Sequence, residues 1–214
     1  MEDIVLVGAG GHCKVIIDII RSNNNFNIVG IVENNKDLIK KSILDIPILG
    51  SDEILADIYN KGVRNAFNCV GGIKDISVRN KTTRRLKDIG FNMPLLVHST
   101  AIVSPYAKIG GGTCVMAGAV INPGALIGED CIINTSSIVE HECVIGNNTH
   151  VSPGVCIAGG VIIGNNTHIG IGSSIIQGVH IGSNVVVGAG SVVINNINDN
   201  TTAVGVPAKI IKCR

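Results

Sequence analysis

Aromatic side chains are almost absent from this 214-residue chain, which has no tryptophan and only 2% aromatic residues. A helical bundle or β-sandwich of this size normally fills its core with large side chains. In this chain 45% of the residues are apolar and 27 are glycine, so it must bury small aliphatic side chains in thin, regular layers. The length is sufficient to bury a core in one large domain or two small ones.

Charge is also scarce and unevenly distributed. The formal net charge of +1 lacks the basic excess of a nucleic-acid-binding protein. Of the 33 charged residues (17 basic plus 16 acidic), 24 lie in 1–96 and nine in 97–214, with none between Glu142 and Asp199. Because asparagines and glycines interrupt this uncharged stretch and would be costly in lipid, we expect a soluble periodic structure without membrane insertion.

The chain lacks the residues that indicate secretion or metal binding. Glu2 and Asp3 occupy the place of the basic region of a signal peptide. The seven cysteines are odd in number and contain no C-x-x-C pair, so we expect reduced thiols in a cytoplasmic protein, with no zinc site and no thiol nucleophile. Two of them, Cys131 and Cys143, occupy positions where small inward-facing residues are expected, which indicates packing.

A six-residue repeat dominates the second half of the chain. Every sixth residue from Val97 to Val193, seventeen in succession, is isoleucine or valine; the fifth position of each hexapeptide is small, and glycine is common at the second. A period of six cannot follow one face of a helix, but it fits a short strand and a sharp corner, repeated as in a parallel β-helix. Three faces per coil predict coils of about 18 residues, so 97–192 supplies about five coils.

The first 95 residues predict a Rossmann-like α/β domain. The expected elements are a strand at 4–7, a glycine turn at 8–12, a helix at 14–21, strands at 27–32 and 66–70, and a helix that follows Gly71 and Gly72 and ends near Ile89. This order predicts a parallel sheet with its ligand at the carboxyl ends of the strands. A glycine turn that opens a helix suits phosphate, although a tight turn without a ligand is the alternative. Cys13 replaces the third glycine of the dinucleotide motif, which argues against a nicotinamide cofactor.

The repeat resembles the left-handed parallel β-helix of hexapeptide-repeat acyltransferases, and Ala203–Lys209 resembles the tail of that superfamily. The segment Asn134–Gly146, which contains His141-Glu142, and the N-terminal part resemble the sialic-acid O-acetyltransferase and bacillosamine-pathway N-acetyltransferase family. The resemblance implies a Rossmann-like nucleotide-sugar-binding domain over 1–95, a left-handed β-helix acyltransferase domain with a C-terminal tail over 96–214, acetyl-CoA as co-substrate and a homotrimer.

His141 is the candidate general base. It occupies the third position of its hexapeptide, so its side chain is expected outside the coil. A neutral imidazole near pH 7 can take a proton from an amine or hydroxyl that attacks a thioester, whereas the alternative is a solvated surface histidine. The resemblance favours catalysis and implies that Glu142 holds the ring tautomer.

The resemblance also implies two binding sites. It places acetyl-CoA at His150, Gly159, Ile171 and Ala189, the nucleotide sugar at Gly10, Gly11, His12, Glu33, Asn34 and Gly71, and a further active-site contact at Asn134. The family usually has an acidic residue at the position of Asn34, and its members most similar to this chain have glycine at the position of Ala189. From the spacing alone, His150 and His168 lie 18 residues apart and are expected to stack in neighbouring coils.

The leading functional hypothesis is acetyl transfer from acetyl-CoA to the amine of a nucleotide-linked 4-amino-4,6-dideoxy sugar. His141 deprotonates the amine during direct attack on the thioester, and the backbone N–H of Gly159 stabilises the oxyanion. O-acetylation of sialic acid or a related nonulosonic acid is the first alternative, since the same base serves a hydroxyl. More distant alternatives are a zinc enzyme resembling the β-helical carbonic anhydrases and a non-catalytic scaffold.

Overall fold

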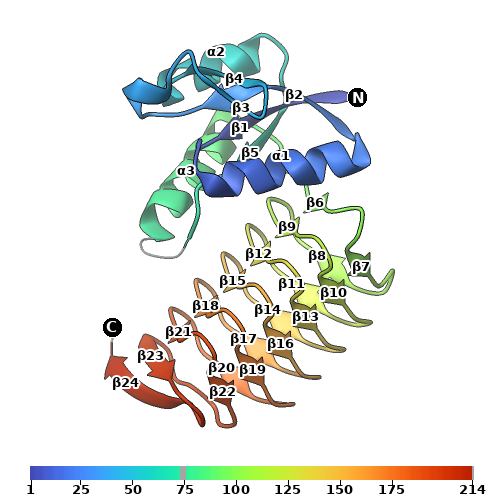
Figure 1. Cartoon of the computed structure of the whole chain (residues 1–214), viewed down its shortest axis with the longest axis vertical. Coiled ribbons are helices and arrows are strands. Elements are labelled where there is room, and N and C mark those ends of the chain that lie inside the picture. The colour runs from blue at the N-terminus through green and yellow to red at the C-terminus, as the bar shows by residue number, and fades with distance from the viewer. Residues whose placement is uncertain (73–75, 214) are drawn as a thin grey trace. The chain divides into compact units, whose positions relative to one another are not determined.

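The computed structural model describes residues 1–72 and 76–213, and the chain divides into two compact units, Met1–Leu96 and Val97–Arg214 (Figure 1). The first unit is an α/β domain, and the second is built from short strands that repeat along the chain. None of the helices in the described part of the chain is long and apolar enough to cross a membrane.

The α/β unit contains a five-stranded sheet with the order β3-β4-β2-β1-β5. Its strands are β1 (Glu2–Val7), β2 (Phe26–Val32), β3 (Ser42–Ile43), β4 (Ile46–Gly50) and β5 (Asn65–Asn68), and its helices are α1 (Gly11–Asn23), α2 (Leu55–Asn60), α3 (Ile76–Ile89) and the 3-10 turns η1 (Lys36–Leu38) and η2 (Asp52–Ile54). The pairs β1–β2, β1–β5 and β2–β4 are parallel, whereas β3 is antiparallel to β4. The carboxyl ends of four strands therefore lie at one edge of the sheet.

The expected helices and strands of this unit are present, with two differences. The first helix is longer than expected at both ends, because it begins directly at Gly11 and closes on Asn24 in a left-handed conformation with φ of 53°. The β3–β4 hairpin and α2 were not expected, because 35–64 contains only short apolar runs without a clear period. The start of the helix expected after Gly72 falls on 73–75, outside the described residues.

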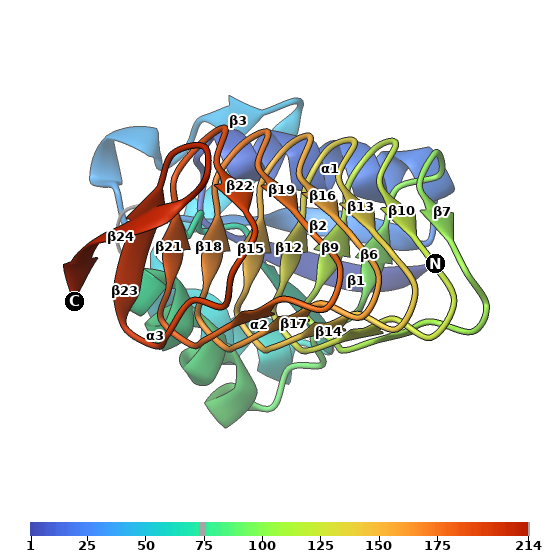
Figure 2. The same cartoon turned by 90° about the horizontal axis from the view of Figure 1, so that it is seen from below.

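The second unit is a three-sided parallel β-helix (Figures 1 and 2). One sheet contains β7 (Ile102–Val103), β10 (Val120–Ile121), β13 (Ile138–Val139), β16 (Cys156–Ile157), β19 (Ser174–Ile175) and β22 (Val192–Val193). The second contains β8 (Lys108–Ile109), β11 (Leu126–Ile127), β14 (Val144–Ile145), β17 (Ile162–Ile163) and β20 (His180–Ile181). The third contains β6 (Leu96–Val97), β9 (Cys114–Val115), β12 (Ile132–Ile133), β15 (His150–Val151), β18 (His168–Ile169), β21 (Val186–Val187), β23 (Thr201–Val204) and β24 (Lys209–Cys213).

The register confirms the predicted coil of 18 residues. Ile121 pairs with Val139 in the next coil, and Val139 pairs with Ile157 in the one after it. The inward aliphatic residues from Val115 to Val193 form a continuous core in which none is more than 5% exposed. Cys131 and Cys143 are fully buried in this core, as expected for packing residues.

The corners of the coils depend on two positions of the hexapeptide. A Cβ at the second-position Gly146 would lie 2.7 Å from the backbone nitrogen of Asn165 in the next coil, so a side chain cannot fit there. The fourth position, which the sequence pattern did not reveal, adopts the left-handed conformation and is usually glycine or asparagine. Glu142 is an exception, with φ of 58°.

Candidate active site

His141 lies at one corner of the β-helix, directly preceding Gly159 in a column of equivalent residues. Backbone hydrogen bonds from Gly160 N to His141 O (2.9 Å) and from Gly178 N to Gly159 O (3.0 Å) hold the successive corners in line. The imidazole is outside the coil, as predicted, and its side chain is 61% exposed. Its Nδ1 lies 3.5 Å from Oε2 of Glu142. An exposed imidazole with a carboxylate at one nitrogen can exchange protons with a bound substrate.

Gly159 provides the space that the His141 ring occupies. A Cβ built on Gly159 would lie 2.6 Å from both Cε1 and Nε2 of that ring, which is far inside van der Waals contact. Among the described residues, the N–H of Gly159 donates no backbone or side-chain hydrogen bond. The corner therefore combines an imidazole nitrogen with an available backbone donor from the neighbouring coil.

The left-handed backbone of Glu142 is unusual for a residue with a long side chain. Such a conformation has an energetic cost, and at corners of this type it is usually adopted by glycine or asparagine. At this position the carboxylate reaches the neighbouring imidazole. The next residue, Cys143, is not a competing nucleophile, because burial raises the pKa of its thiol and keeps it protonated.

A second cluster of polar side chains contains Asn134, His150, Ser152 and His168. Asn134 Nδ2 lies 3.1 Å from His150 Nε2, and Asn134 Oδ1 accepts a hydrogen bond of 2.8 Å from the N–H of Thr135. The Thr135 contact fixes the amide so that its NH₂ group faces His150. His150 Nε2 is then the acceptor, and the proton of the neutral ring resides on Nδ1.

His150 and His168 stack as the spacing predicted. Their ring centroids lie 5.0 Å apart with an interplanar angle of 23°, and Ser152 Oγ lies 2.9 Å from His168 Nε2. Burial lowers the pKa of His168, which favours its neutral form beside the other ring. The sequence reading missed the hydrogen bonds of Asn134 and Ser152. Their common hexapeptide position, 18 residues apart, was the available signal.

One chain does not bring all the expected acetyl-CoA residues to one corner. Ile171 and Ala189 are exposed and belong to the column that contains Pro153, held by the hydrogen bonds Gly172 N to Pro153 O and Gly190 N to Ile171 O. His141 and Gly159 belong to a different column. The second cluster lies beside the Pro153 column, because Ser152 and Asn134 immediately precede residues of that column.

In the α/β unit, the turn between β1 and α1 is open at its glycines. Gly10 and Gly11 would carry a Cβ without meeting any atom within 4 Å, and the first turn of α1 contains no acidic residue. Gly8 adopts φ of 101° and packs against Val70. The positive end of a 13-residue helix is thus accessible to an anion through an exposed glycine turn.

His12 is placed differently from a charged phosphate ligand. Its Nε2 is buried and has no hydrogen-bond partner among the described residues. Burial, together with the positive charge of Arg79, lowers the pKa of His12 to about 4. The ring is therefore neutral near pH 7, and the contribution of His12 to the turn is its backbone N–H rather than a positive charge.

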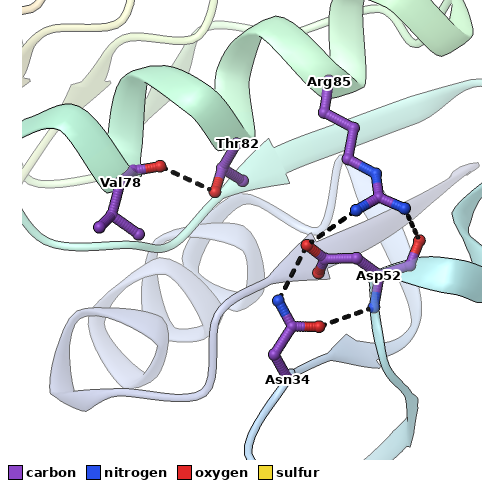
Figure 3. A network of polar contacts seen from close by, with 5 residues as sticks. All are labelled: Asn34, Asp52, Val78, Thr82 and Arg85. Atoms are coloured by element: carbon purple, nitrogen blue, oxygen red, sulfur yellow. Dashed lines mark hydrogen bonds and ion pairs between the residues drawn. The ribbon is translucent and has the colours of Figure 1, made fainter.

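Glu33 and Asn34 follow β2 at the same edge of the sheet. Glu33 accepts hydrogen bonds from the N–H of Ala9 (2.7 Å) and of Asn35 (2.9 Å), so it ties the glycine turn to the end of β2. Asn34 bonds to Asp52 (Figure 3). Gly71 is exposed beyond β5. Within the described residues, no group of three or more His, Cys, Asp or Glu side chains is arranged to hold a metal ion.

Family models match both units. Residues 3–86 match the PglD N-terminal domain, and 124–159 and 160–195 match the bacterial transferase hexapeptide (six repeats). No curated protein sequence matches the chain.

Solved structures match nearly the whole chain. Perosamine N-acetyltransferase from Caulobacter crescentus, in complex with CoA and GDP-perosamine, is 36% identical, with a TM-score of 0.92 over 99% of this chain and 98% of the other. The acetyltransferase domain of PglB from Neisseria gonorrhoeae, in complex with acetyl coenzyme A, is 32% identical, with a TM-score of 0.90 over 98% and 99% of the two chains. These similarities confirm the predicted α/β domain followed by a left-handed β-helix.

Proposed function

Because the chain belongs to the family of hexapeptide-repeat sugar acetyltransferases with a PglD-type N-terminal domain, we propose that it acetylates the amino group of a nucleotide-linked 4-amino-4,6-dideoxy sugar. Acetyl-CoA is the acetyl donor. Two relatives support this proposal: the perosamine enzyme, which was solved with CoA and GDP-perosamine, and the PglB domain, which was solved with acetyl coenzyme A. The observation that carries it is the exposed His141 imidazole, seated over Gly159 with Glu142 at its Nδ1.

His141 acts as the general base. Its Nε2 takes the proton from the sugar amine as the nitrogen attacks the thioester carbonyl, and Glu142 stabilises the resulting imidazolium through Nδ1. The N–H of Gly159 donates to the oxyanion of the tetrahedral intermediate. The C–S bond then breaks, the proton passes to the departing CoA sulfur, and the amide remains. Direct attack requires no acyl-enzyme, because the alignment of two bound substrates lowers the barrier.

The complete site forms between two copies of the chain in a homotrimer. The column with His141 and Gly159 is one side of the cleft, and the column with Ile171 and Ala189, flanked by His150 and Asn134, is the other side. This arrangement follows from the separation of the two columns within one chain. The uncharged stretch from 143 to 198, which covers about three coils of the helix, suits burial between copies.

The α/β unit holds the nucleotide part of the acceptor. Gly10, Gly11 and the backbone N–H of His12 receive the diphosphate, and Gly71 lies beyond β5 at the same edge of the sheet. Glu33 anchors this turn to the end of β2. The nucleoside extends from the turn past β2, where Asn34 lies.

A thiol-release assay tests the proposal directly. The full-length protein is incubated with acetyl-CoA and with 4-amino-4,6-dideoxy sugars linked to UDP, GDP or dTDP, and free sialic acid serves as an alternative acceptor. We expect turnover on at least one nucleotide sugar, with an N-acetylated product identified by mass spectrometry. His141→Ala should lower kcat by about 100-fold or more, as expected for loss of a general base.

Gln177→Ala serves as the control, because Gln177 is exposed at the same corner, one coil after Gly159. This variant should retain wild-type activity. Turnover on sialic acid alone would replace the N-acetyltransferase proposal with O-acetylation. Unchanged kcat in His141→Ala would contradict the assignment of the base.

A further inference from the structure

A continuous set of hydrogen bonds runs along the carboxyl ends of β1, β2 and β4. It begins at Ala9 in the glycine turn, whose N–H donates to Glu33, and continues through the adjacent Asn34. Asn34 Nδ2 donates to Asp52 Oδ2 at 2.9 Å, and Asn34 Oδ1 accepts from the N–H of Asp52 at 3.0 Å (Figure 3). The turn that would hold phosphate is therefore connected to Asp52, which directly follows β4 and Ser51.

Asn34 fixes Asp52 in place, and Arg85 from α3 completes the support. Arg85 Nη1 lies 3.3 Å from Asp52 Oδ2, and Arg85 Nη2 donates to the backbone oxygen of Asp52 at 2.9 Å (Figure 3). Both amide atoms of Asn34 and one carboxylate oxygen of Asp52 are thus engaged. The other carboxylate oxygen, Oδ1, has no hydrogen-bond partner among the described residues, and the Asp52 side chain is 18% exposed. A carboxylate held in one orientation with one oxygen available is suited to bind a donor.

The strand order places this oxygen on the nucleoside side of the phosphate turn. The turn follows β1, β2 is its neighbour, and β4 lies beyond β2. In sheets of this type the ribose lies at the end of the second strand, so the base extends further in the same direction. We infer that Asp52 is a specificity-determining residue that selects a guanine nucleotide, with Asn34 and Arg85 as its positioning residues. This inference rests on the proposed binding of a nucleotide sugar.

The hydrogen-bonding edges of the bases explain the choice. A carboxylate oxygen can only accept, and guanine presents two adjacent donors, N1–H and the N2 amino group. Uracil and thymine present one N–H between two carbonyl oxygens, which a carboxylate repels. The planar guanidinium of Arg85, which is 47% exposed, adds a surface on which a purine can stack.

Calorimetric titration of the full-length protein with GDP, IDP, UDP and dTDP tests the inference. The wild type should bind GDP about tenfold or more tightly than UDP or dTDP, as expected for a hydrogen bond to a charged group. IDP lacks the N2 amino group and should fall between them. Asp52→Asn should remove most of this preference. Asp57→Asn is the matched control, because it makes the same charge change at an exposed position of α2 and should keep the wild-type order.

Asn34→Ala provides a second variant, in which Asp52 keeps its carboxylate but loses its orientation. It should also reduce the preference for GDP, and thermal melting would show that each variant is folded. Equal affinities in the wild type, tighter binding of UDP, or an unchanged order in Asp52→Asn would overturn the inference and leave the proposed acetyl transfer intact. Absence of binding for all four nucleotides would overturn the inference and the nucleotide-sugar proposal together.

Discussion

Replacement of Gly159 by alanine should remove activity without unfolding the protein. Gly159 has no left-handed backbone, so alanine can adopt its conformation. The new methyl group would lie 2.6 Å from Cε1 and Nε2 of His141 and would meet no other atom as closely. Because the imidazole is exposed at the end of a side chain, the ring yields and the coil does not.

The magnitude follows from this contact. Ordinary van der Waals separation is about 3.5 Å, so the ring must move by about 1 Å. A displacement of about 1 Å in a catalytic group can lower the rate by about 100-fold, which corresponds to about 2.7 kcal/mol of transition-state stabilisation. The free energy of unfolding should stay equal or rise by about 0.4–1 kcal/mol, because alanine restricts the unfolded chain.

The measurements are kcat and KM for acetyl-CoA by thiol release, together with thermal melting of Gly159→Ala and Gln177→Ala. We expect kcat to fall in the Gly159 variant while its melting temperature holds, and the Gln177 variant to resemble the wild type in both. Wild-type kcat in Gly159→Ala would refute the role of the ring position. A large loss of stability would show that the coil, rather than the imidazole, accommodates the methyl group.

Two further predictions concern the same cleft. Glu142→Gly should stabilise the protein by about 1 kcal/mol, because it relieves the left-handed backbone, and should lower kcat through loss of the carboxylate beside His141; Asn148→Gly, at the equivalent position of the next hexapeptide, is the control and should change both quantities little in thermal melts and thiol-release assays. Mixing inactive His141→Ala and His150→Ala chains after unfolding and refolding should restore up to about one quarter of wild-type activity if each site combines two copies, since one interface in four then has both sides intact. Mixed chains without activity would favour a site within one chain.

The β-helix could be predicted closely because its repeat leaves few alternatives. Isoleucine or valine at every sixth residue determines which side chains face inward, and the period of six with three faces determines the 18-residue register. The stacking of His150 on His168 followed from the register alone. The left-handed fourth position was missed, because glycine, asparagine and aspartate share it without an obvious pattern.

The α/β unit was predicted less completely, because its connections are irregular. The parallel strands after the glycine turn were recognisable, whereas the β3–β4 hairpin was not. Without that hairpin, no sequence signal brings Asp52 beside Asn34 at the end of β2. The charge state of His12 was equally hidden, since it depends on burial and on Arg79, which is distant in sequence.

The register that builds the core also determines how functional groups can be arranged on the outside. Each outward side chain lies beside the residue 18 positions away, so chemistry on a β-helix is organised in columns: His141 over Gly159, and His150 over His168. A glycine in such a column is then as important for the position of a base as a second polar group would be. Because the columns at different corners of one coil stay separate, a reaction that needs groups from two columns favours assembly of several copies. The same regularity that makes the fold predictable therefore accounts for a cleft shared between chains.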